Sequence, residues 1–256
     1  MSEPRLYYRN WVDSQSIFSL SHGGNSSYLY DRGETLLYTT SGANSDATTS
    51  SIYVYFYEGG IQQNRIIDAI FLKNYNWKNW SASWWNGSSW PTITSDSNDT
   101  NTSRYIGVSP VTTNAVRFDI TSTKTANQEK SIGEIVVCQL LSVAGNNDFS
   151  SYDPKWRERT KEIVLGDGAI HRVNVKDSAG RLCKYEAATK FTYLSKSTRD
   201  ELKAIKDAGQ PFLLQPESVT VPEDVYYVHW ANAWDEKYMS SYKGSGYEVV
   251  MNVKEV

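Results

Sequence analysis

The sequence predicts a mainly β protein of two domains, on three observations. Apolar and β-branched residues fall in short runs without helical periodicity, and loops rich in Gly, Asn, Ser and Thr separate these runs. Aromatic residues make up 13% of the 256 residues, with 18 Tyr and 9 Trp, and these residue types favour strands. Charged residues number 23 up to residue 150 and 32 in the shorter remainder, so the composition changes near that point.

Four runs in the first part predict the strands of a β-sandwich. Short strands joined by polar loops are typical of that architecture. The first run ends at Gly59 and Gly60, where a turn is favourable because glycine accepts positive φ. The runs are residues 51–57 (SIYVYFY), 66–72 (IIDAIFL), 115–120 (AVRFDI) and 132–141 (IGEIVVCQLL).

The domain boundary is expected near residue 150. Residues 144–148 (AGNND) begin a cluster of polar, turn-forming residues that ends at Asp153-Pro154. We therefore expect a first domain at residues 1–148, a linker at 149–154 and a second domain at 155–256.

The second domain is expected to be β-rich with one short helix. Ser197 or Thr198 can cap the helix, Leu202 and Ile205 share one face, and Gly209 ends it. Strands are predicted at residues 190–194, 225–230 (VYYVHW) and 246–253 (GYEVVMNV).

No residue pattern predicts catalysis or a cofactor. None of His22, His171 and His229 has a second His, Cys or carboxylate at metal-ligand spacing, and no Gly-x-Ser-x-Gly elbow occurs. Residues 96–101 could hold calcium through two aspartates, Asp96 and Asp99, but a solvated loop is the expectation there. We therefore expect a protein that is not an enzyme and needs no cofactor or metal.

Charge and hydropathy exclude two further classes of partner. The net charge is −3 and no dense run of Lys or Arg occurs, so nucleic acid is not expected to bind. No stretch of 18 apolar residues occurs, which argues against membrane insertion, and the polar first residues predict no cleaved signal peptide.

The most unusual feature is a tryptophan-rich segment mixed with Asn and Ser. Flat aromatic faces beside amide groups suit sugar rings, and they suit protein interfaces equally well. The segment can also form a hairpin with an Asn-Gly turn that packs alternate tryptophans into the core. The sequence leaves core packing, a protein interface and a glycan site as interpretations. The residues concerned are Trp77, Trp80, Trp84, Trp85, Asn86 and Trp90.

An ordered series of motifs also carries a family resemblance. Residues 36–48 (LLYTTSGANSDAT), the run SIYVYF, residues 65–74 (RIIDAIFLKN), AVRFDI and SIGEIVVC follow one another. In order and spacing they resemble the discoidin or coagulation-factor C-type family of galactose-binding-like domains. The resemblance covers about residues 30–143 and implies a jelly-roll β-sandwich. The family's usual disulfide between the domain ends is absent, which fits a version made in a reducing cytosol.

Other segments resemble proteins of bacteriophage tails. Residues 5–13 (RLYYRNWVD) and 28–32 (YLYDR) resemble the start of tail proteins. Residues 191–195 (FTYLS), the predicted helix and residues 209–216 (GQPFLLQP) resemble the β-sandwich modules of tail-tip and baseplate proteins. The resemblance implies a virion structural protein of a tailed phage, made in the host cytoplasm. It would form a homo-oligomeric ring at the distal tail or baseplate and contact other tail proteins. The alternative is a lectin-like or receptor-binding module that uses the tryptophan-rich segment to bind a host-surface glycan.

Overall fold

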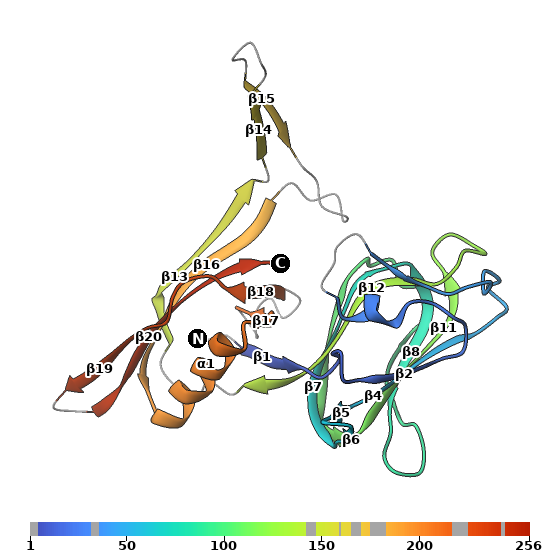
Figure 1. The fold of residues 1–256 in the computed structure, drawn as a ribbon, viewed down its shortest axis with the longest axis horizontal. Coiled ribbons are helices and arrows are strands. Elements are labelled where there is room, and N and C mark those ends of the chain that lie inside the picture. The colour runs from blue at the N-terminus through green and yellow to red at the C-terminus, as the bar shows by residue number, and fades with distance from the viewer. Residues whose placement is uncertain are drawn as a thin grey trace. The chain divides into compact units, whose positions relative to one another are not determined.

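The computed structural model confirms the mainly β prediction. It describes residues 5–31, 36–141, 147–158, 160–164, 170–174, 183–216, 225–241 and 244–256. Most of these residues lie in strands, and the described part contains one α-helix and one 3-10 helix, Ser26–Leu29. The described α-helix is too short and too polar to cross a membrane. The chain divides into a sandwich unit, Arg9–Leu140, and a helix-bearing unit, Met1–Tyr8 with Leu141–Val256 (Figure 1).

The sandwich unit has two antiparallel sheets around one core. One sheet has five strands in the order β2 (Ile17–Leu20), β4 (Ser50–Tyr55), β11 (Ala115–Thr123), β8 (Trp77–Trp84) and β9 (Thr92–Asp96). The other contains, side by side, β10 (Arg104–Thr113), β7 (Arg65–Tyr75) and β12 (Ser131–Leu141), and the short β3 (Tyr38–Thr39) also pairs with β12. A small hairpin, β5 (Tyr57–Glu58) and β6 (Ile61–Gln62), turns at Gly59 and Gly60 with positive φ, as the sequence predicts.

Period-two alternation decides which side chains enter this core. In β4, Ile52 and Val54 are buried while Tyr53 and Tyr55 point to the other face. Each fully buried Ile, Leu or Phe contributes about 1.5–3 kcal/mol, so this alternation supplies much of the stability of the sandwich. Core members from both sheets include Ile52, Val54, Ile67, Ile70, Leu72, Trp77, Phe118, Ile120, Ile135 and Val137.

A buried lysine holds the loop between β3 and β4. The Lys130 side chain is about 1% exposed, and its Nζ donates hydrogen bonds to the carbonyl oxygens of Ala43, Ser45 and Thr48 at 2.9, 2.8 and 2.9 Å. An ammonium group has three protons, so these bonds use all of them. Burial lowers the pKa of Lys130, and the nearby Asp46 carboxylate opposes that shift.

The helix-bearing unit is built on a second antiparallel arrangement. Its strands pair in the order β1 (Arg5–Asn10), β17 (Phe212–Gln215), β18 (Tyr226–Trp230), β20 (Gly244–Glu255), β16 (Cys183–Leu194) and β13 (Asn147–Glu158), and β19 (Asp235–Ser241) also pairs with β20. A separate hairpin joins β14 (Thr160–Val164) to β15 (Ile170–Asn174). The helix α1 (Lys196–Ala208) contacts β16 and β20 and buries Leu202 and Ile205 (Figure 1).

The helix begins earlier than the sequence suggests. Ser195 is the N-cap, with extended backbone angles, and its side chain accepts a hydrogen bond from the Thr198 backbone N–H at 3.1 Å. The expected cap at Ser197 or Thr198 was therefore wrong, because Ser195, directly after β16, already satisfies that amide. The expected end is confirmed: Gly209 adopts the left-handed conformation at φ 60°.

The sandwich unit ends at Leu140, whereas the linker was expected at residues 149–154. Residues 149–154 lie within β13, and residues 142–146 lie outside the described part. The first part of β1, up to Tyr8, belongs with the C-terminal part of the chain, because Arg5, Leu6 and Tyr7 pair with β17. Pairing between segments that lie far apart in the chain leaves no local signal in composition, which is why the sequence does not reveal it.

Candidate functional site

The tryptophan-rich segment forms the hairpin of β8 and β9, as one of the interpretations expects. The loop at residues 85–91 is longer than a two-residue turn, and Gly87 adopts φ 96° within it. Asn86 is exposed, and its Oδ1 accepts hydrogen bonds from the backbone N–H groups of Ser88 and Ser89 at 2.9 and 2.8 Å. The amide of Asn86 therefore shapes the loop.

The tryptophans of this hairpin divide between the core and the surface. Trp77 and Trp80 are 0% and 3% exposed and pack in the sandwich core, where their rings lie 6.1 Å apart. Trp84 lies opposite the buried Val116 and is half-buried at the end of β8. Trp85 and Trp90, also half-buried, belong to the loop that follows.

Trp85 and Trp90 continue a row of rings that begins on β4. Ring centroids lie 6.4 Å apart between Tyr55 and Tyr53, 5.5 Å between Tyr53 and Trp90, and 5.3 Å between Trp90 and Trp85. We call these four half-buried residues the aromatic strip. Contacts at such distances are attractive and hold the rings in place. The strip lies on the face of the five-stranded sheet that points away from the core.

A charged pair on β11 lies beside the strip. The guanidinium carbon of Arg117 is 5.2 Å from the ring centroid of Trp90 and 5.9 Å from that of Tyr53. Its Nε lies 2.8 Å from a carboxylate oxygen of Asp119, and the Ser51 hydroxyl donates to the other oxygen at 2.6 Å. The two charges therefore compensate each other.

Hydroxyl groups occupy most of the remaining outward positions. Among the described residues of these five strands, Ile17 is the one outward aliphatic side chain larger than alanine, and it lies on the edge strand β2. Hydroxyls both donate and accept hydrogen bonds, so this face offers either role to a ligand. The hydroxyl-bearing residues that are exposed or half-buried are Ser19, Ser51, Ser81, Thr92, Ser95 and Thr121.

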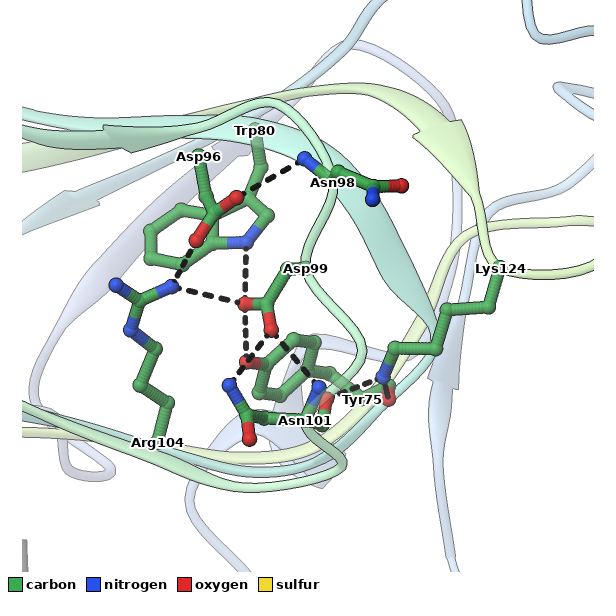
Figure 2. A network of polar contacts seen from close by, with 8 residues as sticks. All are labelled: Tyr75, Trp80, Asp96, Asn98, Asp99, Asn101, Arg104 and Lys124. Atoms are coloured by element: carbon green, nitrogen blue, oxygen red, sulfur yellow. Dashed lines mark hydrogen bonds and ion pairs between the residues drawn. The ribbon is translucent and has the colours of Figure 1, made fainter.

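A second polar cluster lies between β9 and β10 (Figure 2). Asp99 is 3% exposed and its carboxylate accepts hydrogen bonds from the Tyr75 hydroxyl at 2.6 Å and the Trp80 indole N–H at 3.0 Å. The backbone and side-chain N–H groups of Asn101 add bonds of 2.8 and 2.9 Å, and Arg104 adds one of 3.2 Å. The cluster thereby fixes the loop to the core beside the buried tryptophans.

Arg104 supplies the positive charge of this cluster. It binds the carboxylates of both Asp96 and Asp99, the two groups that a calcium ion would have bridged. Lys124 donates to the Tyr75 carbonyl oxygen at 2.7 Å, and burial lowers its pKa. Most of the loop is solvated as expected, since residues 97, 98, 100 and 101 are exposed, but Asp99 is buried under its donors. Among the described residues, no group of three or more His, Cys, Asp or Glu side chains could hold a metal ion.

The ionisation states in the cluster follow from these contacts. Burial alone would raise the pKa of Asp99, but the hydrogen bonds from Tyr75, Asn101, Trp80 and Arg104 outweigh it and hold the pKa below its usual range. Burial, and then the hydrogen bond to Asp99, raise the pKa of Tyr75. Asp99 is therefore ionised and Tyr75 protonated at neutral pH, which suits a structural role for a cluster whose groups are engaged with one another.

Sequence reasoning found half of the aromatic strip and missed the rest. Tyr53 and Tyr55 were counted only as strand formers, and Arg117 and Asp119 only as part of a strand. A signal was present, because alternation puts these residues on the non-core face, where large rings are unusual for a solvated strand. The Asp99 cluster and the Lys130 contacts gave no comparable signal.

Comparisons with known proteins found matches among solved structures. No family model matches the sequence, and no curated protein matches it. Chitosan-binding module 1 from a chitosanase/glucanase of Paenibacillus sp. IK-5 shares 16% identity over 51% of this chain and 98% of that one, with a TM-score of 0.43. The family 32 CBM from C. perfringens NanJ, solved with galactose, shares 15% identity over 53% and 99%, with a TM-score of 0.43. A putative alpha-L-fucosidase from Bacteroides thetaiotaomicron shares 14% identity over 52% of this chain and 29% of that chain, also at 0.43.

The likeness concerns the fold alone. It extends over about half of this chain and carries no residue of a site. The phage tail resemblance has no support from these matches and stays a prediction.

Proposed function

We propose that the sandwich unit binds carbohydrate through the aromatic strip and performs no reaction on it. The observation that carries the proposal is the combination of four contacting rings with a face of hydroxyl groups and one compensated Arg117–Asp119 pair. The C–H faces of sugar rings pack on aromatic rings, while sugar hydroxyls exchange hydrogen bonds with Arg, Asp and Ser.

The composition of the face favours a sugar over a protein partner. The buried centre of a protein interface is typically apolar and poor in charged residues. Here the rings are bordered by hydroxyls and a charged pair, and aliphatic packing is limited to Ile17 at the edge. Trp77 and Trp80 stay outside the proposed site because they are buried in the core.

The assembly role in a phage tail stays a prediction beside this proposal. It comprises the homo-oligomeric ring, other tail proteins as partners and a location in the virion. A receptor-binding element of such a particle would use the same strip, so the two roles are compatible. Electron microscopy of the purified protein and of virions would test it, and a monomer absent from virions would contradict it.

Trp90→Ala is expected to weaken glycan binding about tenfold, because losing one stacked ring removes about 1.5 kcal/mol. Trp90 is the critical position since it contacts Tyr53, Trp85 and Arg117 together. Affinity electrophoresis in gels containing neutral polysaccharides would identify a ligand, and titration calorimetry would then give Kd for the full chain.

The matched control is Tyr238→Ala, which removes a ring that is 63% exposed in the other unit. Its Kd should equal that of the unsubstituted protein. Circular dichroism of both variants would show whether the fold is kept. An equal loss in both variants, or a Trp90→Ala variant that is folded and binds normally, would contradict the proposal.

A further inference from the structure

We infer that the ligand of the aromatic strip is a neutral, linear glycan that lies across the strands and contacts two ring pairs at once. The inference rests on the proposed function and narrows its ligand to a chain, in place of a terminal monosaccharide. One ring pair is Tyr53 with Tyr55, and the other is Trp85 with Trp90.

The length of the strip argues for a chain. Tyr53 and Tyr55 lie on β4, whereas Trp85 directly follows β8, and β11 pairs with both strands from between them. Neighbouring strands lie about 4.8 Å apart, so β4 and β8 are separated by about 10 Å across the sheet. A single sugar ring covers one ring pair of such a strip and leaves the other empty. A linear chain of several units covers both.

The middle of the strip is equipped for hydrogen bonding. Arg117 has five N–H donors, and the contact with Asp119 engages the Nε side of the guanidinium. Asp119 accepts from Ser51 and retains further lone-pair positions. These groups lie on β11, between the strands that carry the two ring pairs, so they face the centre of a bound chain.

The charges beside the strip argue for a neutral chain. Arg117 and Asp119 face each other at 2.8 Å, and both side chains are about one-quarter exposed. The positive charge of Arg117 is already neutralised by Asp119. The negative charge of Asp119 would also repel a carboxylated or sulfated sugar. Recognition of an anion normally uses a cation that can form new bidentate contacts. A neutral sugar needs only the donors and acceptors that this pair offers.

The test is the dependence of Kd on ligand length in titration calorimetry with the full chain. The probes are cello-, manno- and N-acetylchito-oligosaccharides of increasing length from the monosaccharide, with oligogalacturonates as the anionic comparison. We expect Kd for one of the neutral series to fall about tenfold or more between the monosaccharide and the tetrasaccharide and then to level off.

Variants at the two ends of the strip locate the chain. Tyr55→Ala should remove the extra affinity of the longer oligosaccharides. It should leave Kd for the disaccharide nearly unchanged, because the Trp85–Trp90 pair remains. Trp85→Ala should give the same pattern from the other end, so the test survives if one variant fails to fold. Tyr238→Ala should behave as the unsubstituted protein.

Each outcome has a separate meaning. Equal affinity for the monosaccharide and the tetrasaccharide overturns the linear chain, and tighter binding of oligogalacturonates overturns the neutral ligand. Carbohydrate binding stands in both cases. Failure of every neutral and anionic sugar to bind overturns the proposed function and this inference with it.

Discussion

Lys130→Met is expected to lower the free energy of unfolding of the sandwich unit by about 3 kcal/mol, because buried carbonyl groups that lose their donor are costly. Methionine fills a similar volume but donates no hydrogen bond. The carbonyl oxygens of Ala43, Ser45 and Thr48 would lose the ammonium that now joins them. Urea unfolding would measure the loss. Hydrogen exchange should also accelerate at the amides of residues 43–48.

The control for this substitution is Lys155→Met, because the Lys155 side chain is 70% exposed. An exposed lysine is expected to change stability by less than about 0.5 kcal/mol. If Lys130→Met unfolds at the same urea concentration as the unsubstituted protein, the carbonyl contacts contribute nothing and the interpretation of Lys130 is wrong.

Asp99→Asn is expected to lower the free energy of unfolding by about 3 kcal/mol at pH 7, because it removes the buried acceptor of a charge-assisted network. An amide has one acceptor atom, so its NH2 group would face either Tyr75 and Trp80, which donate to Oδ2, or Asn101, which donates to Oδ1. Arg104 would keep only Asp96 as its carboxylate partner. Urea unfolding at several pH values would measure the effect.

The same variant should reveal a dependence on pH. The pKa of Asp99 is lower in the folded protein than in the unfolded chain, so its contribution is complete above the usual Asp pKa of about 3.9. The contribution is lost as the pH falls from there through the folded-state pKa. The difference between the unsubstituted protein and Asp99→Asn should therefore shrink below about pH 4. Asp207→Asn, at a side chain that is 60% exposed, is the control, and a pH-independent difference would contradict the role of Asp99.

The sequence predicts the strands that carry a clear two-residue alternation. β4, β11 and β12 were expected within a few residues of their observed bounds, since each has a continuous apolar run. Alternation does not predict that the side chains of Trp77 and Trp80 are both buried. They lie three positions apart and yet both enter the core, because the pairing of β8 with β11 is irregular between Ile120 and Ser122.

The candidate site depends on contacts that local patterns cannot show. Tyr53 and Trp90 meet because β4 and the β8–β9 hairpin flank β11, and that register is set by the whole sheet. The three carbonyls bound by Lys130 lie 82 to 87 residues away in the chain. A lysine before a strand is usually solvated, so its burial appears only once the fold is assembled.

The pairing of β1 with β17 has a consequence for the order in which the chain acquires structure. Tyr7 and Gln215 share a hydrogen bond although they are 208 residues apart, so the pairing of β1 with β17 can form only late in synthesis on the ribosome. The sandwich unit is complete in sequence by Leu140, long before β17 emerges.

The folded sandwich unit therefore shortens the chain path between the two parts of the helix-bearing unit. Its two ends lie side by side, because the Trp11 backbone N–H donates to the Val137 carbonyl oxygen at 2.8 Å. Once this unit has folded, the long stretch between β1 and the later strands behaves as a short connection, and the entropy lost in closing it is small. When the sandwich unit is already folded, closing the chain of the helix-bearing unit therefore costs less conformational entropy.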